Sequence, residues 1–281
     1  MISNIKLLNG SLLDLSGPPL VMAIVNCNED SFYAPSRALA EQAVERALEA
    51  AAAGAAIIDF GAESTRPGSE YVDADTEIKR LIPVLRQFVK QSSVPVSVDT
   101  RKAAVARAAL EEGALIINDI SALQDDSEMA ALCAARGAAV VLMHKKGIPA
   151  TMQDQPYYDD VVAEVNTFLR DAAQRAEAAG IGMDKIILDP GIGFGKRLQD
   201  NLDLLAHLAE IGDGMYPLLV GVSRKSFIGA ITGRAPEERL AGTLAAHAAA
   251  YYRGAKILRV HDVKETVDFI KVLKAIDQSK G

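Results

Sequence analysis

The sequence predicts an α/β fold: one closed (β/α)8 barrel, a TIM barrel, preceded by a short N-terminal lead-in. Eight short apolar runs alternate with longer amphipathic segments, which is the pattern of parallel strands connected by helices. Each connection is longer than the roughly ten to twelve residues that two neighbouring parallel strands require. No internal repeat or linker interrupts the alternation, so we expect one domain. A doubly wound open sheet is the alternative that the same alternation allows.

The strands are predicted from continuous apolar runs that end at a polar residue, a pattern typical of strands buried on both faces of a parallel sheet. In chain order, they cover residues 20–25, 55–60, 94–98, 114–117, 138–143, 186–188, 217–222 and 255–260. Residues 1–19 are expected to form a polar lead-in that ends at Gly17-Pro18-Pro19. Residues 20–281 are then the barrel domain.

The helices are predicted from the longer segments between these runs. In chain order, they cover residues 38–53, 77–90, 101–112, 127–136, 158–179, 201–211, 236–252 and 263–276. The first of them carries Glu and Arg on one face. Gly54, Gly113 and Gly180 follow three of the helices directly, as expected where the backbone turns left-handed at a helix end.

The strand predicted at residues 186–188 leads into the most informative loop of the chain. It runs directly into Asp189, and Pro190 stops it because proline has no N–H to donate to a neighbouring strand. The alternating glycines of residues 191–195 let the backbone turn sharply and approach a ligand closely, and Lys196 follows them. Asp189 is therefore expected at the carboxyl end of a buried strand, where parallel α/β folds bind ligands.

This loop matches neither of two common glycine motifs. A Walker A loop needs glycine where Pro190 stands and Ser or Thr where Arg197 stands, and the third glycine of a dinucleotide fingerprint falls on Lys196. A structural aspartate that caps the next helix is the alternative interpretation of Asp189.

Polar residues follow nearly every predicted strand. They are Asn26, Asp59, Asp99, Asn118, His144, Asp189, the group Ser223-Arg224-Lys225, and Arg259 with His261. One such residue is ordinary helix capping, but a full set at the end where barrels place their sites indicates a binding site.

These residues divide into two chemical sets. Asp99, Asn118 and Asp189 offer acceptors and an amide, which suit the N–H edge of a heterocycle. The donors and cations that suit phosphate are Arg224, Lys225, Arg259 and His261. Asn26 offers an oxygen to magnesium, which prefers hard oxygen ligands together with substrate phosphates. The residues alone predict a small-molecule ligand, a heterocycle that bears a phosphate or diphosphate.

Composition excludes several other functions. The net charge of −7 and the lack of a basic block argue against nucleic acid or an anionic membrane as a partner. The two cysteines, Cys27 and Cys133, form neither a CxxC motif nor a disulfide framework. Because we find no signal peptide and no apolar run of membrane-spanning length, we expect a cytoplasmic enzyme.

Eight motifs in register resemble the dihydropteroate synthases over residues 20–275. They are NCNEDSF (26–32), GAESTRPGS (61–69), SVDTRK (97–102), NDIS (118–121), MHKKG with TMQ (143–153), LDPGIGFGK (188–196), GVSRKSFIG (221–229) and RVHDVKET (259–266). The resemblance implies a (β/α)8 barrel, a homodimer, and a magnesium-assisted transferase of folate biosynthesis that is the target of sulfonamides. Such a transferase joins 6-hydroxymethyl-7,8-dihydropterin diphosphate to p-aminobenzoate and releases pyrophosphate.

The resemblance also implies roles for individual residues, with Asp99, Asp189 and Lys225 as the catalytic ones. The pterin-binding residues are Asp99, Asn118, Asp189 and Lys225. The diphosphate-binding residues are Asn26, Thr65, Arg259 and His261, with magnesium at Asn26. The residues around p-aminobenzoate are Phe32, Thr65, Arg66, Pro67, Phe194, Lys225 and Ser226.

The first loop departs from the usual family pattern, N-V-T-P-D-S-F. Asn28 and Glu29 occupy the Thr and Pro positions, so the backbone is freer and a negative charge is added near the diphosphate. Two alternatives stay open: a methyltransferase that uses methyltetrahydrofolate, and a non-catalytic barrel that binds pterin or a partner protein.

Several other residues favour structural roles. His207 and His247 lie inside predicted helices, and His144 has no second zinc ligand at a suitable spacing. Asp59 is interpreted as a member of a buried network rather than a ligand. Cys27 lies near the site but has no paired base, which argues against a nucleophile.

Overall fold

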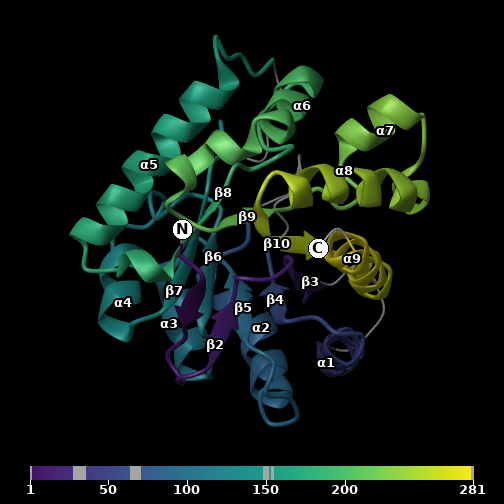
Figure 1. Ribbon diagram of the computed structural model, residues 1–281. Helices are drawn as coiled ribbons and strands as arrows, with labels where there is room; N and C mark the ends of the chain where they lie inside the picture. The colour runs from purple at the N-terminus through teal and green to yellow at the C-terminus, as the bar shows by residue number, and fades with distance from the viewer. Residues whose placement is uncertain (1, 28–35, 64–70, 148–151, 153–154, 280–281) are drawn as a thin grey trace.

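The structure, a computed structural model, describes residues 2–27, 36–63, 71–147, 152 and 155–279. Parallel strands close into a barrel in the order β10-β3-β4-β5-β6-β7-β8-β9, and helices surround it (Figure 1). The barrel strands are β3 (Leu20–Asn26), β4 (Ile57–Gly61), β5 (Val96–Asp99), β6 (Ile116–Asp119), β7 (Ala139–Met143), β8 (Ile186–Asp189), β9 (Leu218–Val220) and β10 (Ala255–Val260). The prediction of a closed barrel is confirmed, and the open sheet is excluded.

The helices in the described part of the chain lie mostly where the sequence predicts them. They are α1 (Ser36–Ala52), α2 (Ala74–Phe88), α3 (Ala103–Glu111), α4 (Met129–Arg136), α5 (Val161–Ala178), α6 (Leu198–Ala206), α7 (Ser226–Thr232), α8 (Leu240–Tyr252) and α9 (Val263–Gln278). Short 3-10 segments add η1 (Met183–Lys185), η2 (Leu208–Gly214) and η3 (Pro236–Glu238). Among the residues described, no helix has the length and apolar character needed to cross a bilayer.

Two predicted helices differ from the structure. The helix predicted at 201–211 begins earlier, as α6, and continues as the 3-10 turn η2, while the helix predicted at 236–252 is divided into η3 and α8. Helix α7 was not predicted, because it is short and contains Gly229, a poor helix former. A Cβ added at Gly229 would lie 2.3 Å from the Arg239 guanidinium, so close packing explains the glycine.

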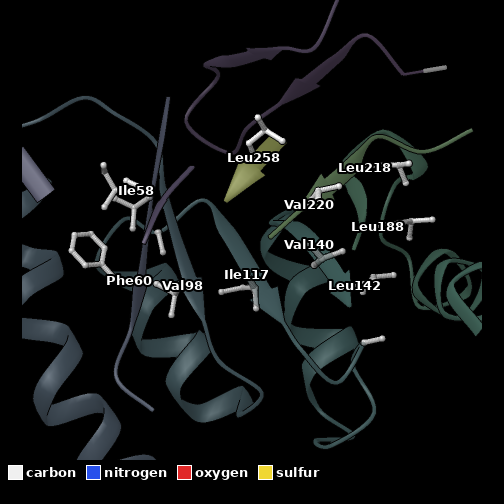
Figure 2. Packing of buried hydrophobic residues seen from close by; sticks show 14 of the residues in the cluster. Ile58, Phe60, Val98, Ile117, Val140, Leu142, Leu188, Leu218, Val220 and Leu258 are labelled. Carbon is white, nitrogen blue, oxygen red and sulfur yellow. The ribbon is translucent and has the colours of Figure 1, made fainter. Parts of the chain in front are cut away.

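Alternation along the barrel strands divides the core into two parts. Side chains such as Ile58, Ile117 and Leu188 belong to a large cluster between the strands and the helices, and Figure 2 shows them on the separate strands β4, β6 and β8. Their strand neighbours Ile57 and Ile187 belong instead to a second cluster inside the barrel. This is the two-residue period of a strand that is buried on both faces.

The N-terminal segment precedes the barrel, as expected, but it is a hairpin with buried apolar side chains rather than a polar segment. Strands β1 (Asn4–Lys6) and β2 (Leu12–Asp14) pair antiparallel across a turn in which Gly10 has a φ of 85°. The residues that it buries, each at most 3% exposed, are Ile5, Leu7, Leu13 and Leu15. They pack with the inward side chains near the start of the barrel strands, and the hairpin therefore closes the amino end of the barrel.

Candidate active site

The same alternation brings polar residues to the carboxyl end of the barrel. Residues two positions apart on a strand share a face. The inward residues that lie two positions after inward isoleucines are Asp59, Asn118, Asp189 and Arg259. Asp99 ends β5 and pairs in register with Asn118. The residues predicted from strand ends therefore meet at one mouth.

Arg259 joins two carboxylates at this mouth. Its Nε lies 2.7 Å from Asp59 Oδ2, and one of its terminal nitrogens lies 2.9 Å from Asp99 Oδ2. Asn118 Nδ2 also donates to Asp59 Oδ2, at 3.1 Å. The interpretation of Asp59 as a buried network member is confirmed, because it is fully buried and holds two predicted ligands.

Burial shapes the charge of this cluster. It raises the pKa of Asp99 to about 7; the Arg259 cation opposes this shift, and the Asp59 carboxylate adds to it. Arg259 carries one positive charge, so it cannot fully neutralise the negative charges of both the Asp59 and the Asp99 carboxylates. The cluster therefore takes up or releases a proton near neutral pH more readily than an exposed aspartate.

Asp189 is fixed by the glycine loop that follows it. Its Oδ1 accepts a hydrogen bond from the Gly191 backbone N–H at 2.7 Å, and the residue is 6% exposed. Burial raises the pKa of Asp189, and the Lys225 cation opposes the shift. Asp189 is thus an oriented carboxylate that faces a cation across the mouth.

Lys225 and Phe194 form one contact. The Lys225 ammonium lies 4.5 Å from the centroid of the Phe194 ring and donates a hydrogen bond to the Ile192 carbonyl. A Cβ on Gly193 would lie 3.1 Å from Lys225 Cδ, so the lysine stem packs on that glycine. Burial lowers the pKa of Lys225 to about 8; Asp189 opposes this shift and Arg259 adds to it.

The remaining predicted residues lie at the rim. Asn26 ends β3 and is exposed, and Ser226 is the exposed first residue of α7. Ser223 Oγ lies 3.1 Å from His261 Nδ1 and accepts the backbone N–H of His261 at 3.2 Å. His261 is therefore oriented by β9 and β10 together.

Arg224 does not join the cationic set predicted for phosphate. Its Nε donates to Asp262 Oδ2 at 2.9 Å, and a second nitrogen contacts the other carboxylate oxygen. Such a two-pronged ion pair satisfies the guanidinium where it stands. Its role is to hold the β9–α7 turn against the end of β10.

Phe32, Thr65, Arg66 and Pro67 lie outside the described residues, as do Asn28 and Glu29. Glu63, directly before the second of these segments, is a residue that sequence reasoning missed. Its carboxylate lies 2.7 Å from Lys102 Nζ and 3.1 Å from an Arg101 nitrogen. It also accepts the Val72 backbone N–H at 3.1 Å, and thereby joins the two sides of the second loop.

The residues for which the sequence favours structural roles have surroundings in the structure that agree with such roles. His207 is exposed and pairs with Glu210 at 2.8 Å. His247 is fully buried, and neither ring nitrogen has a hydrogen-bond partner among the described residues. Burial raises the pKa of the Cys27 thiol to about 12, which argues against a thiolate nucleophile. His144 contacts Lys196 behind the mouth.

The carboxyl end of this barrel holds buried hydrogen-bond acceptors beside the cations Arg259 and Lys225. This arrangement suits the binding of a charged heterocycle. The family model described as "Pterin binding enzyme" matches residues 22–261. The dihydropteroate synthase of Escherichia coli (strain K12) is 47% identical over 273 residues, which cover 96% of each chain.

Solved structures agree with the family match. A Xanthomonas albilineans dihydropteroate synthase with 4-aminobenzoic acid has a TM-score of 0.91 and 44% identity, and the match covers 99% of each chain. A Yersinia pestis dihydropteroate synthase in complex with a sulfonamide drug has a TM-score of 0.92 and 42% identity, with 98% of this chain and 99% of that chain covered.

The chain therefore belongs to the pterin-binding enzyme family, and among its members to the dihydropteroate synthases. Its activity is that of a transferase, which condenses 6-hydroxymethyl-7,8-dihydropterin diphosphate with p-aminobenzoate to 7,8-dihydropteroate and pyrophosphate. The predicted family, fold and activity are confirmed, in preference to a methyltransferase or a non-catalytic barrel.

Proposed function

We propose that the pterin ring binds deep in the barrel mouth, between Asp99, Asn118 and Asp189, with Lys225 beside it. The observation that carries this assignment is the meeting of two buried carboxylates and an amide at one end of the barrel. Asp59 accepts a hydrogen bond from the Asn118 amide nitrogen, and this orients the Asn118 oxygen to accept an N–H from the ring. The Asp189 carboxylate then accepts hydrogen bonds from the N–H groups at the aminopyrimidinone edge of the ring.

The diphosphate is assigned to the rim, on Asn26, Thr65, Arg259 and His261. Arg259 supplies a fixed cation, because Asp59 and Asp99 hold its guanidinium in place. His261 is oriented by Ser223. Charge that develops on the leaving pyrophosphate is thereby stabilised by groups already in position.

The reaction requires no nucleophile from the protein. The bond between the pterin methylene carbon and the diphosphate oxygen breaks, and its electron pair leaves with pyrophosphate. The p-aminobenzoate nitrogen forms the new bond to that carbon and loses a proton. Asp99 stabilises the positive charge that develops on the pterin, and the enzyme acts mainly by positioning and electrostatics.

The p-aminobenzoate pocket is assigned to Phe194, Lys225 and Ser226, together with Phe32, Thr65, Arg66 and Pro67. The contact between Lys225 and the Phe194 ring supports this assignment, because it places an apolar wall beside a cation for the substrate carboxylate. The Xanthomonas albilineans relative solved with 4-aminobenzoic acid and the Yersinia pestis relative solved with a sulfonamide drug support the same class of ligand.

Magnesium is proposed as the cofactor, with Asn26 as the protein ligand. The described residues contain no group of three His, Cys, Asp or Glu side chains that suits a metal ion. An exposed amide oxygen at the end of β3 nevertheless fits magnesium, which often uses one or two protein ligands plus substrate phosphates and water. When bound, the ion would neutralise charge on the leaving group.

Two further assignments are proposals about the protein as a whole. We propose a homodimer, and Ile231 and Tyr252, 58% and 56% exposed on the contacting helices α7 and α8, are candidate contacts. We also propose a cytoplasmic location. Cys27 and Cys133 are both free and buried, as expected in a reducing compartment.

Release of pyrophosphate from the pterin diphosphate tests the proposed roles. The wild-type chain should release it only when p-aminobenzoate is present, and Arg259→Ala should weaken binding of the pterin diphosphate more than binding of the free pterin. Equal loss for the two ligands would remove Arg259 from the diphosphate site.

A further inference from the structure

The glycine loop after β8 turns several carbonyl groups toward one point. Gly191, Gly193 and Gly195 all have left-handed backbone, with φ values of 64°, 84° and 63°. The Gly191 and Phe194 carbonyl oxygens lie 2.9 and 3.2 Å from Lys196 Nζ. The loop thus curls around the ammonium group of the residue that ends it.

The end of β7 supplies the other side of this enclosure. His144 Nδ1 lies 2.9 Å from Lys196 Nζ, and the His144 carbonyl lies at 3.4 Å. Lys196 is only 3% exposed. We name this set, Lys196 Nζ with the carbonyls of His144, Gly191 and Phe194 and the His144 ring, the ammonium cage.

The two loops that form the cage approach very closely. A Cβ on Gly191 would lie 1.9 Å from the His144 carbonyl oxygen, and one on Gly195 would lie 2.2 Å from the Lys146 carbonyl oxygen. Only glycine fits at these two positions, and the carbonyl oxygens of His144, Gly191 and Phe194 converge within 3.4 Å of one point, Lys196 Nζ. Carbonyl dipoles that converge in this way repel one another unless a cation lies between them. The cage therefore has the chemistry of a small cation site, and the chain fills it with its own ammonium group.

The cage fixes two groups of the proposed active site. Gly191 donates its N–H to Asp189 while its carbonyl accepts from Lys196, so the residue that orients Asp189 is held through both of its backbone groups. Phe194 has its carbonyl on Lys196 and its ring beneath the Lys225 ammonium. Lys196 itself lies behind these groups, away from the rim.

We propose that Lys196 is a positioning residue of this enzyme, whose buried ammonium replaces a bound cation and holds the β8–α6 loop in the shape that presents Asp189 and Phe194 to the substrates. The inference rests on the proposed roles of those two residues. No step of the reaction passes through Lys196, and its effect is exerted through the loop.

Burial affects the charge of both side chains in the cage. Burial and the neighbouring Lys196 lower the pKa of His144 to about 2, so its ring is neutral and Nδ1 is an acceptor with the proton on Nε2. Burial also lowers the pKa of Lys196 to about 7, and Asp189 opposes that shift. The carbonyl acceptors around Nζ favour the charged form.

Replacement of the ammonium tests the proposal. Lys196→Met keeps most of the stem but removes the charge and the donors. We expect kcat/KM for p-aminobenzoate to fall about tenfold to a hundredfold, the usual range for loss of a charged hydrogen-bond set. The matched control is Lys185→Met, because Lys185 Nζ donates to the Gly137 carbonyl at 2.6 Å at the opposite end of β8. Wild-type kinetics in Lys196→Met would overturn the proposal.

Chemical rescue separates the cation from simple packing. Lys196→Ala lacks the atoms of propylammonium, and this ion should restore its activity saturably and raise its Tm. The neutral isostere 1-propanol should do neither, and Lys185→Ala should respond to neither compound. Equal rescue by 1-propanol, or equal rescue of Lys185→Ala, would show that the site needs volume rather than charge.

A further measurement does not depend on activity, and its main result comes from the wild-type chain. Nitrogen NMR of the histidine rings should show His144 neutral, with its proton on Nε2, and Lys196→Met should change that signal. A proton on Nδ1 in the wild type would contradict the cage. Failure of the proposed function would appear differently, as a wild-type chain that makes no product while the His144 signal is as expected.

Discussion

Among single residues, Asp59 has the largest indirect influence on the proposed site. It is fully buried, yet it touches both Arg259 and Asn118 through the same oxygen, Oδ2. The first of these contacts fixes a cation for the diphosphate, and the second decides which way the Asn118 amide points. One carboxylate therefore sets the orientation of two groups that contact the substrate in the proposed complex.

Asp189→Asn is expected to abolish tight pterin binding and leave the fold intact. Asparagine keeps the oxygen that accepts the Gly191 N–H, so the loop is retained, but the charge and one acceptor are lost. Loss of a charge-assisted pair costs roughly 1.5–3 kcal/mol, or about ten- to a hundredfold in affinity. Calorimetric titration with free pterin measures this, and unchanged affinity in a folded variant would remove Asp189 from the site.

The charge of Lys225 should make kcat/KM depend on pH, with a loss of activity at basic pH. Its pKa is lowered to about 8 by burial, so its charge is lost as the pH rises through about 8. Because the neutral amine no longer attracts substrate anions, kcat/KM should fall across that range. In Lys225→Arg the charge persists, and any remaining activity should lack this basic limb. Parallel pH–rate profiles test it, and an identical limb in the variant would assign the titration to another group.

The site was predictable at the strand ends and less so elsewhere. Asp99, Asn118 and Asp189 are found from sequence because a buried strand that ends in a polar residue marks one defined end of the barrel. The ion pair of Arg224 with Asp262 depends on two side chains far apart in sequence, and no local pattern indicates it. The same holds for Glu63 with Lys102.

At the scale of elements, the N-terminal hairpin is expected to contribute to stability and not to catalysis. It lies at the amino end of the barrel and takes no part in the mouth. Its signals in the sequence are the Asn9-Gly10 turn and the alternation of Leu13 and Leu15 with Asp14, both of which are typical of a hairpin. They were missed because the segment is short and each of its strands has only three residues.

Leu13→Ala should lower the free energy of unfolding by about 2–5 kcal/mol, the usual cost of a cavity in a packed core. Leu13 is 3% exposed, whereas its neighbour Leu12 is 62% exposed and serves as the matched control. Leu12→Ala should change stability by less than about 0.5 kcal/mol. Urea unfolding measures both, and kcat should stay near the wild-type value in each. Equal stabilities would show that the hairpin does not seal the barrel.

At the scale of the whole molecule, the two ends of the barrel have different roles, structural at the amino end and functional at the carboxyl end. The amino end is closed by apolar side chains from the hairpin, and the carboxyl end gathers charged groups. Parallel pairing was predictable because the seven connections between the eight strands are long enough for it, and eight strand–helix pairs favour a closed barrel. The glycine inside α7 has its explanation in the nearby Arg239 guanidinium, a contact that only the three-dimensional arrangement reveals.

Inhibition by a sulfonamide that carries a para-amino group tests the site as a whole. Such a compound copies p-aminobenzoate in its ring, its amine and its polar tail. It should therefore compete with p-aminobenzoate for the surface of Phe194, Lys225 and Ser226. It should not compete with the pterin diphosphate, which is held mainly by Asp99, Asn118, Asp189, Arg259 and His261, none of which is assigned to the aminobenzoate pocket.

The order of binding follows from the shared position of Lys225, which lies between the proposed pterin site and the Phe194 ring. A bound pterin diphosphate completes the wall of the aminobenzoate pocket, so the sulfonamide should bind much more weakly without the pterin substrate or pyrophosphate. Glu29 adds a negative charge to the first loop and should reduce this coupling, since it opposes the diphosphate. Steady-state kinetics with each substrate varied in turn decide the matter, because competition against the pterin diphosphate would place the inhibitor in the wrong pocket.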